Sequence, residues 1–195
     1  KTVNEIREIL GKTGKYDLER IKQAFINAFY RPEKKLFADS TVSSHSALHS
    51  NVVPLFYGLV PDDAIDSVIN FIREKKLSCG VYMAYFLLKG LARAGAHDLA
   101  YNLIVSDDTH SWSNMLKEGA TTCFEALGKD QKWNTSLCHP WASCPVPVLI
   151  EDIAGIKPGK PGWEEISFDP HIPASLTHLT IEFNTVKGRI KLEHH

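Results

Sequence analysis

The sequence predicts a mainly α-helical protein in which successive helical hairpins are followed by a short antiparallel β segment. Through roughly the first two thirds of the chain, apolar residues recur three or four positions apart, as in helices that bury one face. From Gly155 onward the apolar residues approach alternation, which favours strands. The 195 residues are 44% hydrophobic with a net charge of -1, so we expect a globular fold with a buried core.

Three groups of apolar residues predict three amphipathic helices. They are Leu18, Ile21, Phe25 and Phe29, then Ile65, Val68, Ile69 and Ile72, then Val81, Ala84, Tyr85, Leu88 and Leu91. Turn-forming residues separate the groups at Pro32, residues 61–63, residues 78–80 and Gly95. Asp62 or Asp63 is suited to cap the helix that follows. Helix, turn and helix are therefore expected in repetition, although periodicity does not distinguish a toroid from an open bundle or a solenoid.

The C-terminal part predicts strands after a turn-rich linker at residues 157–162. Two groups of near-alternating apolar residues mark the strands: Trp163, Ile166 and Phe168, then Leu179, Ile181 and Phe183. Lys187 and Gly188 predict a hairpin turn into a last strand at residues 189–192. Because about three strands are the minimum for a sheet that is stable alone, we expect this segment to open a longer β domain.

Charge and hydropathy argue against two classes of partner. The chain has 22 Lys and Arg against 23 Asp and Glu, and this balance supplies no field for nucleic acid or anionic lipid. No apolar stretch approaches the roughly 20 residues that span a bilayer, and residues 1–5 lack the apolar core of a signal peptide. We expect both ends to be cloning boundaries, with residues 192–195 the remnant of a histidine tag. A periplasmic, secreted or cytoplasmic location stays open.

The cysteines and histidines form no metal-binding motif that we recognise. The cysteines are Cys79, Cys123, Cys138 and Cys144. They lack CxxC spacing, so we expect buried free thiols, no metal and no cofactor. His45 and His49 lie four residues apart and could share a helix face, but no glutamate completes a HExxH motif. Sugar contact and a structural helix-face pair both remain open for these histidines.

The most informative segment sets a carboxylate and an imidazole among small and aromatic residues. Residues 119–125 read Gly-Ala-Thr-Thr-Cys-Phe-Glu, and residues 136–143 read Ser-Leu-Cys-His-Pro-Trp-Ala-Ser. This pair resembles the part of the bacterial α-L-rhamnosidases, glycoside hydrolase family 78, that carries the second catalytic carboxylate. The resemblance covers roughly residues 20–190 and includes residues 44–49, 58–61 and 158–170.

The resemblance implies a six-hairpin α/α barrel followed by a small β-sandwich. Residues 1–154 are then expected to be part of the catalytic barrel, and residues 155–191 the start of the sandwich. Because the chain would then hold only part of the barrel, the apolar face around Leu18, Ile21, Phe25 and Phe29 would be left uncovered. We therefore expect a homodimer through that face, because large exposed apolar patches tend to be buried by association.

The same resemblance makes Glu125 the expected general base of an inverting reaction that removes terminal α-L-rhamnose from a rhamnose-containing glycoside or polysaccharide. From the residues alone, an exposed structural carboxylate at a helix end is the alternative. His139, which precedes Pro140, corresponds to a histidine that contacts the sugar in that family. Its alternative is a histidine packed at a helix start.

Aromatic residues are further candidates for sugar binding. Trp112, Trp133 and Trp141 each offer a ring face that can stack on a sugar. We rank Trp112 first because residues 107–112 are expected to form a polar loop, and His110 in the same loop is a weaker candidate.

The general acid that the resemblance requires is not recognisable. Residues 1–37 hold no Asp- and Glu-rich motif of the family's kind, and their carboxylates fall in predicted amphipathic helices. The leading interpretation is the base side of a glycosidase site, without activity by itself. A non-catalytic carbohydrate-binding or helical interaction module, and a different α/α-barrel glycosidase or lyase, are the alternatives.

Overall fold

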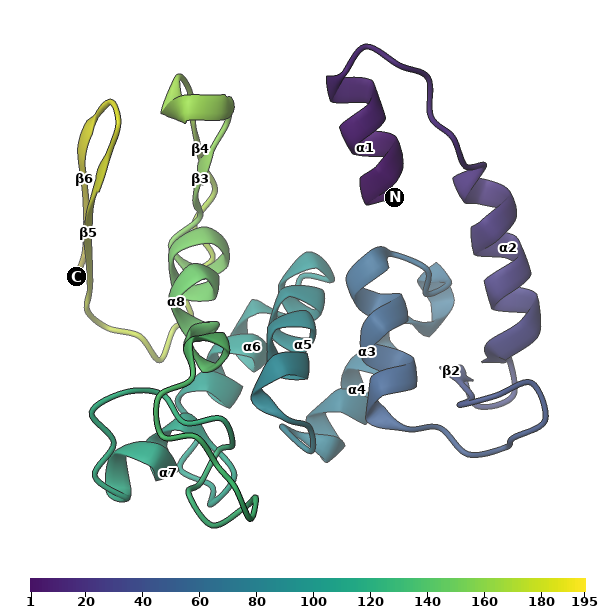
Figure 1. Ribbon diagram of the computed structural model, residues 1–195, viewed down its shortest axis with the longest axis horizontal. Coiled ribbons are helices and arrows are strands. Elements are labelled where there is room, and N and C mark those ends of the chain that lie inside the picture. Colours follow the sequence, from purple (N-terminus) through teal and green to yellow (C-terminus); the bar gives the residue numbers. More distant parts are fainter.

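The computed structural model describes all 195 residues, and the protein is mainly α-helical (Figure 1). The helices are α1 (Thr2–Ile9), α2 (Leu18–Phe29), α3 (Leu48–Tyr57), α4 (Ile65–Lys75), α5 (Val81–Arg93), α6 (His97–Ile104), α7 (Trp112–Lys117) and α8 (Pro145–Val148). Short 3-10 turns are η1 (Asp62–Ala64), η2 (Pro140–Ser143) and η4 (Pro161–Trp163), and η3 (Leu149–Ile153) is a π-helical turn. The three predicted helices are confirmed as α2, α4 and α5. No helix is long and apolar enough to cross a membrane.

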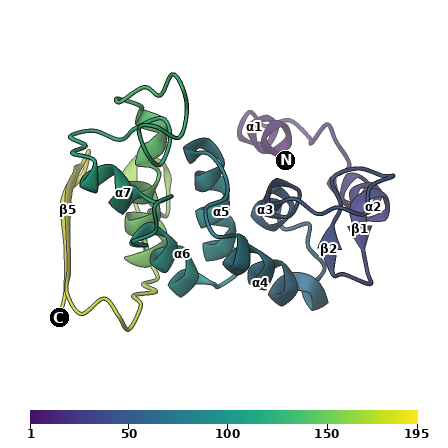
Figure 2. The ribbon, with the colours of Figure 1, turned by 90° about the horizontal axis from the view of Figure 1, so that it is seen from below.

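The core lies among α3, α4, α5 and α6, which Figure 2 shows as neighbouring helices. Its fully buried side chains include Val52, Val68 and Leu88. Burying an aliphatic side chain of this size stabilises the fold by about 1.5–3 kcal/mol before the entropy of ordering it is subtracted. Helix α5 approaches α3 closely because Gly90 has no side chain, and a Cβ atom there would lie 3.3 Å from the backbone nitrogen of Phe56.

Helix α2 lies at one edge of the molecule and is only partly covered (Figure 1). Phe25 and Phe29 on its apolar face are half-buried and pack against the core. Leu18 and Ile21 on the same face are 38% and 53% exposed. The apolar face that the sequence predicts is therefore buried at its C-terminal end and exposed at its N-terminal end.

Helix capping differs from the prediction at α4. Asp62 and Asp63 begin the turn η1, and α4 follows Ala64 without a side-chain cap. The Asp63 carboxylate instead pairs with Lys35 at 3.2 Å. The prediction that either aspartate caps this helix is wrong, because the intervening 3-10 turn separates both residues from the helix N-terminus.

The two histidines expected to share a helix face do not do so. His49 lies within α3, whereas His45 lies in the connection before it. Nδ1 of His45 contacts Oδ2 of Asp39 at 2.5 Å. The prediction is wrong because the helix begins only at Leu48, so helical spacing does not extend back to His45.

All four cysteines are free thiols. Burial raises the pKa of the Cys79 thiol to about 11 and that of the Cys144 thiol to about 12. Cys123 is half-buried and Cys138 is exposed. The prediction of a buried thiol is wrong for Cys138, because that residue lies in an irregular surface segment rather than in a core-facing element.

The strands form three separate two-stranded antiparallel pairs. They are β1 (Tyr30–Arg31) with β2 (Leu36–Phe37), β3 (Ile156–Pro158) with β4 (Ile166–Phe168), and β5 (Leu179–Thr185) with β6 (Gly188–His194). The predicted hairpin turn is confirmed, since Thr185 pairs with Gly188 across it. Two details differ: Trp163 lies in η4 with a φ of 59° rather than in a strand, and Ile156–Pro158, whose last two residues were expected in the linker, forms β3.

Ion pairs join the helices to the C-terminal segment. Lys89 of α5, whose side chain is 7% exposed, pairs with Glu151 at 2.6 Å and with Asp152 at 2.7 Å. Asp152 also pairs with Lys157 of β3 at 3.0 Å. Because breaking a buried ion pair leaves an uncompensated charge, these contacts hold η3 and β3 against the helical part.

Candidate functional site

An irregular segment between α7 and η2 carries the predicted carboxylate and imidazole. The left-handed backbone of Gly119, with a φ of 81°, turns the chain out of α7. Two backbone hydrogen bonds then pair the segment with itself: Glu125 N–H donates to Ser136 O and His139 N–H donates to Cys123 O, both at 2.8 Å. The two parts of the motif therefore lie side by side, with Glu125 and His139 at the positions where they pair.

The Glu125 carboxylate is held by two donors. Its Oε1 accepts a hydrogen bond from Nζ of Lys132 at 2.5 Å, and its Oε2 accepts one from the backbone N–H of Ser136 at 3.1 Å. These two donors, Lys132 first, lower the pKa of Glu125, and the nearby His139 lowers it further. The carboxylate is therefore ionised at neutral pH. The Glu125 side chain is 27% exposed, and the residue lies in an irregular segment rather than at a helix end.

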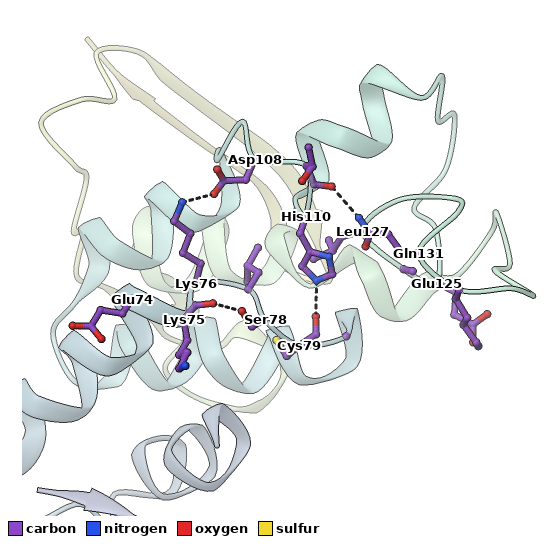
Figure 3. A pocket seen from close by; sticks show the side chains of 15 residues that line it. Glu74, Lys75, Lys76, Ser78, Cys79, Asp108, His110, Glu125, Leu127 and Gln131 are labelled. Atoms are coloured by element: carbon purple, nitrogen blue, oxygen red, sulfur yellow. Dashed lines mark hydrogen bonds and ion pairs between the residues drawn. The ribbon is translucent and has the colours of Figure 1, made fainter. Parts of the chain in front are cut away.

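Glu125 lines a cleft of about 780 Å³, which lies between the C-terminal end of α4, the turn before α5 and the irregular segment (Figure 3). Lys76 and Asp108, which both line it, pair at 2.8 Å. Nε2 of His110 lies 3.1 Å from the carbonyl oxygen of Cys79. The structure thus brings the predicted residues Glu125 and His110 into one polar cleft.

His139 and Trp141 do not line this cleft, although His139 lies near Glu125. His139 has an extended backbone, with φ -136° and ψ 98°, and precedes Pro140, which begins η2. Trp141 is 59% exposed and stacks on Tyr82, with ring centroids 4.6 Å apart. These two aromatic rings border a second groove of about 360 Å³, so Trp141 does not line the same cavity as Glu125.

Trp112 lies elsewhere than expected. It is the first residue of α7 rather than part of a polar loop, because Ser111 caps the helix by accepting a hydrogen bond from Asn114 N–H. Its indole Nε1 donates to the carbonyl oxygen of Ala142 at 2.7 Å, and the ring is half-buried against the core. The loop prediction is wrong for Trp112, and the residue joins α7 to η2. Trp133 is 95% exposed and lines neither cavity.

Lys132 and Tyr82 are two residues of the site region that the sequence did not predict. Lys132 lies seven residues after Glu125 in a segment without regular periodicity, so no spacing rule pairs them. Tyr82 meets Trp141 only through the packing of α5 against η2. No group of three His, Cys, Asp or Glu residues has the geometry to hold a metal ion.

Two family models match the chain. The bacterial α-L-rhamnosidase six-hairpin glycosidase domain matches residues 1–153, and the bacterial α-L-rhamnosidase C-terminal domain matches residues 155–195. Among curated proteins, an α-L-rhamnosidase of Formosa agariphila is 25% identical over 91% of this chain and 19% of its own length. One of Streptomyces avermitilis is 26% identical over 88% of this chain and 17% of its own length. The chain thus spans about a fifth of these relatives.

Solved structures of α-L-rhamnosidases are also similar to this chain. The α-L-rhamnosidase from Dictyoglumus thermophilum is similar with a TM-score of 0.82 and 27% identity, over 98% of this chain and 22% of that one. The Streptomyces avermitilis α-L-rhamnosidase complexed with L-rhamnose has a TM-score of 0.77 at 24% identity, over 97% of this chain and 19% of that one, and supports the fold. Because the two family models cover nearly every residue, the chain belongs to the bacterial α-L-rhamnosidase family of six-hairpin glycosidases.

Proposed function

We propose that this chain is part of a glycoside hydrolase that removes terminal α-L-rhamnose from a rhamnose-containing glycoside or polysaccharide, and that Glu125 is its general base. The observation that carries the proposal is an ionised carboxylate, fixed by Lys132 and Ser136, on the wall of a polar cleft. Family membership supports the substrate class.

An inverting mechanism assigns Glu125 a defined step. Its carboxylate accepts a proton from water while the water oxygen bonds to the anomeric carbon on the face opposite the departing group. The glycosidic C–O bond breaks, and the leaving oxygen takes a proton from a second carboxyl group about 6.5–9.5 Å away. The lowered pKa of Glu125 keeps it in the form that can accept a proton at neutral pH.

The general acid is proposed to come from outside these 195 residues. A general acid must be protonated at the working pH, which requires a raised pKa. Asp108 shares the cleft, but the hydrogen bonds from Lys76, first, and Ser106 lower its pKa. Asp108 is therefore unsuited to this role. The greater length of the matched relatives leaves room for an acid elsewhere in such an enzyme.

The remaining candidates have proposed binding roles. We propose that His139, which lies near Glu125, donates a hydrogen bond to a sugar hydroxyl, and that His110, which lines the cleft, also contacts the sugar. Trp141 offers an exposed ring face for stacking. Trp112 keeps only a weak case as a sugar contact, because its ring is half-buried and its indole N–H is already bonded.

A binding role without catalysis is the second candidate. The groove that Tyr82 and Trp141 border favours it, because exposed stacked aromatic rings suit sugar binding without any acid or base. This alternative predicts that loss of the Glu125 carboxylate leaves the activity, which is then sugar binding, unchanged.

Glu125→Gln in an enzyme that contains the whole barrel separates the two functions. The substitution is nearly isosteric, so we expect kcat on an aryl α-L-rhamnoside to fall at least about a hundredfold with little change in KM. Glu19→Gln, an exposed carboxylate on α2, is the matched control and should leave kcat unchanged. A Glu125→Gln enzyme that retains more than about a tenth of kcat would remove Glu125 from the base role.

A further inference from the structure

Glu125 and Ser136 pair at the two ends of a loop, and the same loop contains Lys132, the cationic partner of Glu125. Glu125 N–H donates to Ser136 O at 2.8 Å, and Ser136 N–H donates back to Oε2 of Glu125 at 3.1 Å. Between them, Lys132 reaches back so that its Nζ lies 2.5 Å from Oε1. Donors from the same loop therefore occupy both carboxylate oxygens, which restricts rotation of the side chain.

The Lys132 side chain is not needed to shape this loop. The turn at residues 132–135 is closed by Thr135, whose N–H and hydroxyl donate to the backbone carbonyl of Lys132 at 3.3 and 2.7 Å. The ammonium group has Glu125 as its polar partner, and the Lys132 side chain is 41% exposed. An ion pair this exposed contributes little to stability. Its main effect is on the charge and direction of the Glu125 carboxylate.

We propose that Lys132 is a positioning residue for Glu125, which orients the carboxylate in the cleft. This inference rests on the proposed general-base function of Glu125. With Oε1 and Oε2 each holding one donor, their remaining lone pairs are the ones left to accept a proton from water. Lys132 thereby keeps Glu125 ionised down to a lower pH, although a carboxylate with a lower pKa is also a weaker base.

Other charged groups lie near the carboxylate or line the same cleft, and their effects must be separated from that of Lys132. His139 lies near Glu125 and acts in the same direction on its pKa. The cleft walls also carry Glu74, Lys75, Lys76, Asp108 and His110. Of these, Lys76 and Asp108 neutralise each other as a pair. Lys132 is the group in direct contact with Glu125, so removing it should change the titration of Glu125 specifically.

The test is a titration of the Glu125 carboxyl group in this chain, followed by NMR with ¹³C-labelled glutamate and assigned through Glu125→Gln. Lys132→Met should raise the titration midpoint of Glu125 toward that of an ordinary glutamate, and Lys132→Arg should restore a low midpoint. Lys129→Met is the matched control, since Lys129 lies on the same loop and only its backbone N–H is bonded. It removes the same charge and should leave the midpoint nearly unchanged.

An unshifted midpoint in Lys132→Met, or equal shifts in Lys132→Met and Lys129→Met, would overturn the inference. Unchanged tryptophan indole signals confirm that each variant folds, and Lys132→Gln is the second neutral variant if Lys132→Met does not fold. In an enzyme with the whole barrel, Lys132→Met should move the acidic limb of the kcat/KM profile to higher pH, with rescue by Lys132→Arg. The titration needs no turnover, so its failure is distinct from retention of activity by Glu125→Gln, which would contradict the proposed function.

Discussion

His97 and His171 stack with ring centroids 3.8 Å apart and planes within 10° of parallel. His97 begins α6, whereas His171 follows β4 and is held by a backbone hydrogen bond from its N–H to Ile153 O at 2.9 Å. The pair therefore links the helical part to the C-terminal segment, close to the ion pairs of Asp152. Two imidazoles at this separation cannot both be charged without repulsion.

The stacked pair predicts that stability falls in mildly acidic solution. Burial, first, and the charge of His171 lower the pKa of His97; Lys157 acts in the same direction, while Gly95 O and Asp152 oppose it. Because the folded state lowers this pKa, the contribution of His97 is present above the ordinary histidine pKa and is lost as pH falls below it. We expect Tm to fall by a few degrees between about pH 7.5 and about pH 5.5.

His97→Phe keeps a ring in the stack but cannot be protonated, so its Tm should depend less on pH over that range. His49→Phe, an exposed histidine on α3, is the control and should keep the wild-type dependence. Differential scanning calorimetry of the three proteins makes the comparison. Equal pH dependence in all three would show that the pair does not titrate during unfolding. His171 also contacts Asp169 at 3.1 Å, so His97 is the better position for the substitution.

A second prediction concerns activity. We expect the 195-residue chain to show no hydrolysis of an aryl α-L-rhamnoside above background, because the pKa values of the cleft carboxyl groups of Asp108 and Glu125 are both lowered, which does not suit a general acid. Positioned proton donation contributes roughly 100- to 10,000-fold to such reactions. A chromogenic assay at high protein concentration measures this directly. Clear turnover that Glu125→Gln abolishes would mean that the acid lies within this chain.

A third prediction concerns association. Leu18 and Ile21 leave part of α2 apolar and exposed, and α1 exposes Val3 and Ile6. A groove of about 510 Å³ lies between these helices. Exposed apolar surface of this kind favours self-association, most simply through a two-fold interface. We expect light scattering coupled to gel filtration to detect dimers that dissociate on dilution.

Ile21→Lys should shift this equilibrium toward monomer, while Val42→Lys should not, because Val42 is 96% exposed but lies outside the groove. A monodisperse monomer at every concentration, without binding of a hydrophobic dye, would contradict the prediction.

The sequence by itself determined the helices whose apolar residues recur at helical spacing, because that pattern depends only on local geometry. It also determined the C-terminal hairpin, since Lys187 and Gly188 follow an alternating strand. The start of α3 was not predictable in this way, and His45 was placed wrongly for that reason.

The residues around Glu125 depended on tertiary structure. The motif identified Glu125 and His139, but only the folded chain pairs Cys123 with His139 and Glu125 with Ser136. The half-buried position of Trp112 and the stacking of His97 on His171 arise between segments that no sequence period relates, and the contact of Lys132 with Glu125 arises within an irregular loop that has no period. The physical reason is that periodicity reports which face of one element is buried, whereas these contacts depend on how separate elements pack against one another or on how an irregular loop folds.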